Sequence, residues 1–106
     1  MKTLTLGIND RLLIKSVLLG LRGGADILRQ IFRVVDIVDL SEEEEKKINL
    51  RQEGMKLLWD DDEEINTKFK FEDADFEFMK KHVNAKNDYP ADKRTIALID
   101  KINKKE

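Results

Sequence analysis

The chain has 106 residues, and its 20 basic and 22 acidic side chains nearly cancel to a net charge of −2. With 41% hydrophobic residues, this balance excludes a disordered chain, and the length suits one hydrophobic core, so we expect a single domain over residues 1–106. The absence of cysteine excludes disulfides, thiolate metal sites and cysteine nucleophiles.

The first residues do not predict a secretory leader. Met1–Leu6 begins in the manner of a signal peptide, but the polar residues 9–11 interrupt the apolar region of about 7 to 15 residues that such a leader needs. The longest apolar stretch, residues 12–21, contains a lysine and falls short of the roughly 20 residues that cross a bilayer. We therefore expect a cytoplasmic protein.

Two helices are predicted in the first 40 residues. Asn9 or Asp10 can cap the first helix, and glycines from Gly20 onward end it after an apolar face made by Leu12, Leu13, Val17 and Leu21. The second begins at Ala25, and its apolar residues recur at helical spacing: Ile27, Ile31, Val34, Val35 and Val38. Because Val34–Val38 is rich in β-branched residues, this last part is compatible with a helix or a strand.

A short third helix and a β-hairpin follow. Ser41 stands three residues before Glu44, the spacing of a capping box, and this helix should run to about Lys47. Residues 48–51 then alternate between apolar and polar, and Glu53-Gly54 supplies a two-residue turn. A turn of that length places three pairs opposite one another: Ile48 and Trp59, Leu50 and Leu57, Gln52 and Met55.

The rest of the chain predicts one strand and two helices. Phe69 and Phe71 alternate with lysines in a strand near 66–71, and Asp73 begins a helix whose apolar face contains Phe76, Met79 and Val83. A last helix, about 91–103, follows Pro90 and should pack Ile96, Ile99 and Ile102 inward. We therefore predict an α+β fold of about five helices, in which a three-stranded antiparallel sheet joins the hairpin near 48–59 to the strand near 66–71.

Charge is unevenly distributed along the chain. Residues 41–77 include 14 acidic and 6 basic side chains, a net charge of −8, whereas both flanking segments are mildly basic. Two acidic groups account for most of this excess: Glu42, Glu43, Glu44, Glu45 and Asp60, Asp61, Asp62, Glu63, Glu64. The second group is not a calcium loop, because Ile65 and Phe71 stand where that loop requires glycine and glutamate. We interpret both groups as a surface that binds a partner protein with a basic surface.

Catalytic chemistry has few candidate residues here. Nucleophilic catalysis pairs a serine or threonine with a base, and this chain has two serines, Ser16 and Ser41, and one histidine, His82. Ser41 is already explained as a helix cap, and the position of His82 on a predicted helix is typical of a structural or surface histidine. We therefore expect no enzyme, no cofactor and no metal site.

Nucleic-acid binding is the alternative function. Three helices followed by a hairpin are the outline of a winged helix, although the third helix would place four glutamates where nucleic-acid readers carry Lys and Arg. Four basic residues nevertheless give one face of the predicted sheet a positive charge: Arg51, Lys56, Lys68 and Lys70.

Several pieces of the sequence resemble small proteins encoded by tailed phages and prophages. The resembling pieces are Leu4-Thr5-Leu6 with Arg11-Leu12-Leu13-Ile14, then Leu40-Ser41-Glu42-Glu43-Glu44, then Trp59 after a glycine turn, then Lys68-Phe69-Lys70-Phe71. This resemblance implies an accessory protein of a phage or mobile element in the host cytoplasm, and it implies no activity and no site residues. Together with the acidic groups, it leads us to expect a non-enzymatic protein-interaction module.

Overall fold

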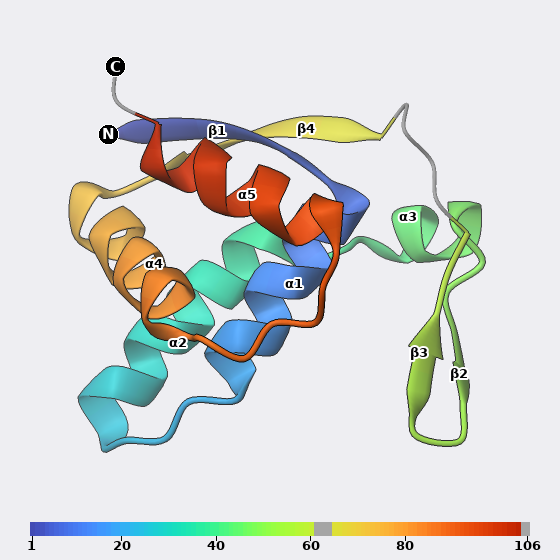
Figure 1. Ribbon diagram of the computed structural model, residues 1–106, viewed down its shortest axis with the longest axis horizontal. Coiled ribbons are helices and arrows are strands. Elements are labelled where there is room, and N and C mark those ends of the chain that lie inside the picture. The colour runs from blue at the N-terminus through green and yellow to red at the C-terminus, as the bar shows by residue number, and fades with distance from the viewer. Residues whose placement is uncertain (61–64, 105–106) are drawn as a thin grey trace.

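The computed structural model describes residues 1–60 and 65–104. Within those ranges it contains five α-helices and four β-strands (Figure 1), so the predicted α+β class and number of helices are confirmed. In chain order the elements are β1 (Lys2–Gly7), α1 (Ile8–Leu19), α2 (Ala25–Val38), α3 (Glu42–Lys47), β2 (Arg51–Glu53), β3 (Lys56–Leu58), β4 (Asn66–Phe71), α4 (Asp73–Ala85) and α5 (Lys93–Asn103). No helix in the described ranges is long and apolar enough to cross a membrane.

The main sheet consists of two antiparallel strands that are distant in sequence, β1 and β4. They pair from Lys2 opposite Phe71 to Gly7 opposite Asn66. The three-stranded sheet expected from sequence is therefore divided, because β4 pairs with the N-terminal strand and the hairpin β2–β3 forms a sheet of its own. This pairing places the leucines of β1 and the phenylalanines of β4 on one face, toward the core. The strands of the hairpin are only three residues long and could not pair with the whole of β4.

The hairpin turns one residue later than predicted. Arg51 lies opposite Leu58 and Glu53 opposite Lys56, so the two turn residues are Gly54 and Met55. Gly54 has a φ of +62°, which a type II′ turn requires at its first central position and which glycine adopts without a steric penalty. The predicted pairing of Leu50 with Leu57 is therefore replaced, and Leu57 faces Gln52.

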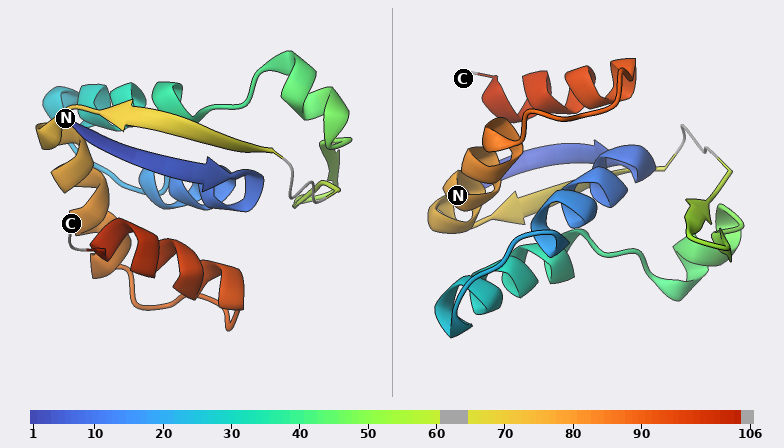
Figure 2. Two further views of the ribbon diagram at one scale, coloured as in Figure 1. Left: turned by 90° about the horizontal axis from the view of Figure 1, so that it is seen from above. Right: turned by 60° about the horizontal axis from the view of Figure 1, so that its bottom comes forward.

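Four helices and the main sheet form the body of the protein. Across the body the order is α5, β1, β4, α2, with α1 packed under the sheet and α4 closing one end (Figure 2). The core draws its fully buried side chains from every one of these elements: Leu6, Ile14, Leu18, Val34, Val38, Phe71, Met79, Leu98 and Ile102. One hydrophobic core thus unites the two ends of the chain.

Two helix predictions are resolved by the structure. The β-branched segment Val34–Val38 is helical, as the last turns of α2, and three of its valines enter the core. In α5 the predicted inward face is displaced, since Leu98 is buried with Ile102 while Ile96 is exposed. The helix begins at Lys93 because the side chain of Asp92 caps it, accepting a hydrogen bond from the backbone N–H of Arg94 at 2.8 Å.

Candidate functional site

The helix α3 and the hairpin β2–β3 project together from one side of the body, and we call residues 41–60 the arm (Figure 1). A second, smaller core holds the arm to α1, with Ile8, Leu40 and Ile48 buried at its centre. The half-buried Trp59 packs against this core, and its indole Nε1–H donates to Asn9 Oδ1 at 3.1 Å. Trp59 therefore helps to hold the arm against α1.

A buried arginine locks the arm to the body. Arg11, on α1, is only 2% exposed, and its guanidinium donates to the backbone carbonyls of Val38 (2.8 Å) and Asp39 (2.6 Å) between α2 and α3. It also binds the carboxylate of Glu44 in α3 with two hydrogen bonds, at 2.6 and 3.0 Å, and lies 5.0 Å from the ring centroid of Phe69. A guanidinium satisfied by so many partners fixes where α3 lies.

Glu44 has two roles in this lock. The same carboxylate accepts from the backbone N–H of Ser41 at 3.0 Å, while the Ser41 hydroxyl accepts from the N–H of Glu44 at 3.2 Å, so the predicted capping box is confirmed. Hydrogen bonds from Arg11 are the main cause that lowers the pKa of Glu44 to about 2, opposed by desolvation and assisted by the Ser41 N–H. Glu44 is therefore ionised and occupied, rather than open to a partner.

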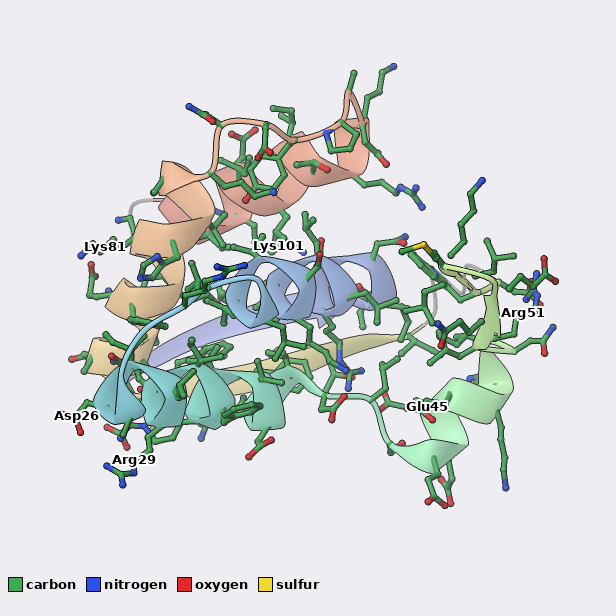
Figure 3. The ribbon with its side chains drawn as sticks, turned by 90° about the horizontal axis from the view of Figure 1, so that it is seen from below. Asp26, Arg29, Glu45, Arg51, Lys81 and Lys101 are labelled. Atoms are coloured by element: carbon green, nitrogen blue, oxygen red, sulfur yellow. The ribbon has the colours of Figure 1, made fainter. Side chains whose placement is uncertain are left out.

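The other predicted acids of the arm are more accessible. Glu42 and Glu43 are exposed on α3 and Glu45 is half-buried beside them, on the arm side of the molecule with Arg51 (Figure 3). Asp60 is exposed, with its carboxylate 3.4 Å from the Arg51 guanidinium. The remaining predicted acids, Asp61, Asp62, Glu63 and Glu64, lie outside the described residues.

An apolar pocket of about 300 Å³ lies between the arm and the body. Leu12 and Leu13 of α1 contribute to its wall together with Leu57 and Trp59 of the arm, and the polar residues of the lining are Asn9, Ser16, Asp92, Arg94 and Thr95. Leu57 in this lining is 47% exposed, and Met55, at the hairpin turn of the same arm, is 101% exposed, although both are large apolar side chains. The arm thus has large apolar side chains that no other part of the described chain covers.

Two of the groups considered for catalysis, His82 and Ser41, lie on opposite sides of the molecule (Figure 1). His82 lies on α4, at the opposite side of the body from the arm that contains Ser41 (Figure 1), and its ring meets the ring of Phe78 edge-on with 4.6 Å between centroids. Burial, and secondarily the charge of Lys81, lower the pKa of His82 below its ordinary value. Among the described residues, no three histidine, aspartate or glutamate side chains gather in a group that could hold a metal ion.

The basic residues behind the nucleic-acid alternative are divided between two sheets. Lys68 and Lys70 share the outer face of the main sheet, whereas Arg51 and Lys56 belong to the hairpin. The expected continuous basic face is therefore absent from the described residues. The third helix of the winged-helix outline, α3, is only six residues long and has no buried residue.

Comparison with known proteins gives no relative from which a role could be inferred. The chain matches no family model, no curated protein and no solved structure. The site must be judged from its own geometry. Arg11, which organises that geometry, was missed in the sequence, because arginine is rarely buried and its partners at Val38, Asp39 and Glu44 are distant in the chain.

Proposed function

We propose that this chain is a non-enzymatic protein-interaction module, an accessory protein of a phage or mobile element, which binds a partner through its arm. The observation that carries the proposal is the exposure of Leu57, which lines the apolar pocket, and of Met55 at the hairpin turn of the same arm. Contiguous exposed apolar surface with a polar rim is typical of a site that another protein covers.

The charges of the arm specify the kind of partner. Glu42, Glu43 and Asp60 are exposed around the arm, where six acidic side chains outnumber four basic ones over residues 41–60. A basic partner surface would be steered toward these acids, while apolar side chains from the partner fill the pocket and supply most of the binding energy.

The fixed position of α3 in the arm supports the same proposal. The guanidinium of Arg11 fixes α3 by four hydrogen bonds, two to backbone carbonyls and two to Glu44. A surface held in place before binding loses less conformational entropy when the partner arrives, which favours affinity.

The test is capture of a partner by matched charge variants. The arm variant carries Glu42→Lys, Glu43→Lys and Asp60→Lys, and the control carries Asp26→Lys, Asp36→Lys and Asp100→Lys, which are exposed acids of α2 and α5. Both change the net charge equally. The arm variant should lose a partner protein that the wild type and the control retain at low salt; equal capture by both variants would reject the proposal, as would capture of nucleic acid alone.

A further inference from the structure

A second groove lies at the free edge of the main sheet, away from the arm. It measures about 790 Å³ and runs between β1 and two helices. Its lining residues are Lys2, Thr3, Leu4 and Thr5 from β1, then Phe76, Glu77 and Lys80 from α4, then Lys101, Ile102, Asn103 and Lys104 at the end of α5. We call it the edge groove. Its volume is within the range of about 300 to 1,000 Å³ that is usual for ligand sites.

The edge of β1 that faces this groove is open. Among the described residues, β1 exchanges its strand hydrogen bonds with β4 alone, and no other backbone bond reaches Lys2–Leu6. In both views of Figure 2, β4 lies on one side of β1 and α5 on the other. A strand edge with unpaired N–H and C=O groups is a template for another extended chain, which gains main-chain hydrogen bonds by adding to the sheet.

Lysines from three separate elements make the edge groove basic. Lys2, Lys80, Lys101 and Lys104 line it, and Glu77 is the one carboxylate among the described residues of that lining. Lys101 reaches toward α1 (Figure 3), where its Nζ lies 2.9 Å from the Asp10 carboxylate, so the positive excess of the lining rests mainly on the other three. Positive charge along an open strand edge complements an extended segment with a negative charge.

We propose that the edge groove binds an extended acidic segment of a partner protein, which adds to β1 as a third strand. Its main chain pairs with the open edge, and its carboxylates lie among Lys2, Lys80 and Lys104. A nucleic acid would satisfy the same lysines but has no alternating N–H and C=O groups to pair with a strand, so the open edge favours a polypeptide. The arm lies across the molecule from α4 and the start of β1 (Figure 1), so this proposal stands or falls independently of the arm's role.

The probe is a fluorescent peptide as long as β1, with glutamate and valine alternating, titrated into the full chain. Fluorescence anisotropy gives its Kd, and backbone NMR shows which amides respond. We expect saturable binding below about 1 mM, with shifts at Thr3, Leu4 and Thr5. A peptide with lysine in place of glutamate should not bind, and methylation of alternate backbone nitrogens should weaken binding at least about tenfold, because it removes donors to the strand edge.

Matched variants locate the site. Lys80→Glu with Lys104→Glu should raise the Kd about tenfold or more, whereas Lys81→Glu with Lys93→Glu, which change exposed lysines of the same helices outside the groove, should leave it within about twofold. Equal weakening by both pairs, undiminished binding of the methylated peptide, or no binding at all would overturn the proposal. So would tighter groove-dependent binding of a single-stranded oligonucleotide, or self-association that the Lys80 variant abolishes.

Discussion

Replacing Glu44 by glutamine removes the negative charge that Arg11 holds while keeping an oxygen for the Ser41 N–H. The magnitude follows from the pKa of Glu44, which is lowered from an ordinary 4.5 to about 2. Since one pKa unit corresponds to about 1.4 kcal/mol, the ionised carboxylate contributes about 3 kcal/mol to the free energy of unfolding at pH 7. The cost of breaking a buried ion pair by removing one partner is of similar size, about 3 to 5 kcal/mol.

The pH dependence gives this prediction its sign. Because the pKa is lower in the folded protein, the contribution of Glu44 is complete above pH 4.5 and is lost as the pH falls through about 2. Urea unfolding of the wild type and of Glu44→Gln should therefore differ by about 3 kcal/mol at pH 7 and by less than about half of that at pH 3. Taking the difference between the two proteins cancels the titration of other carboxylates.

Glu43→Gln is the matched control, because Glu43 is exposed in the same helix and carries the same charge. Its unfolding free energy should stay within about 0.5 kcal/mol of the wild type. A Glu44→Gln effect no larger than this at pH 7, or one that is the same at pH 3, would refute the role assigned to the Arg11–Glu44 pair.

Three further predictions concern the turn, the histidine and the core. Gly54→Ala should destabilise the hairpin turn by about 1 kcal/mol and so speed amide exchange in the hairpin. Gly54→Asn should destabilise the turn less, because asparagine tolerates a positive φ better than alanine. Equal effects of the two substitutions would contradict the positive φ. NMR titration of His82 should give a midpoint below 6.5, and this midpoint should rise in Lys81→Gln. Because the pKa is lower in the folded protein, the free energy of unfolding should fall as the pH drops through 6.5. A midpoint above 6.5 would argue against burial of His82. Leu18→Ala should lower the free energy of unfolding in urea by about 2 to 5 kcal/mol, and the same change at its half-exposed neighbour Leu19 should lower it by under about 1 kcal/mol. Similar losses in the two variants would contradict the burial of Leu18 in the core.

The helices were predictable because the sequence signals for each of them lie within the helix or at its ends. The capping box of Ser41 and Glu44 fixes the start of α3, and the spacing of apolar residues identifies α2 and α4. Two helices differ from their predictions. α1 begins at Ile8 after Gly7, rather than after Asn9 or Asp10, and buries Ile14 and Leu18. α5 begins after Asp92 and buries Leu98 in place of Ile96. Local signals of this kind depend on neighbours within one or two helical turns, which a sequence displays directly.

The sheet was harder because its pairing is not local. Lys2 and Phe71 pair in the main sheet although most of the chain separates them in sequence, and the residues near either one do not indicate the other. The alternation of threonine and leucine over Thr3–Leu6 is a strand signal, but the same residues also resemble the start of a signal peptide, which obscured it. The predicted register of the hairpin was wrong for a different reason. The turn lies one residue later than predicted, which places Gly54 at the position that needs a positive φ.

The candidate site was predicted in part. Composition located the acids of the arm, yet it could not show that Glu44 is already held by Arg11. Nor could it show the apolar pocket, because Leu12 and Leu57 meet only when the arm folds against α1. Tertiary contacts of this kind decide which charged and apolar groups remain free for a partner.

The most direct test of the arm's role is photo-crosslinking from single positions in the cell that makes the protein. A photoreactive amino acid replaces Met55 at the arm in one variant and Phe32, an exposed apolar residue of α2, in the other. We expect a covalent adduct with one partner protein from position 55 and none from position 32. An adduct from position 32 alone, or no adduct from position 55, would contradict it.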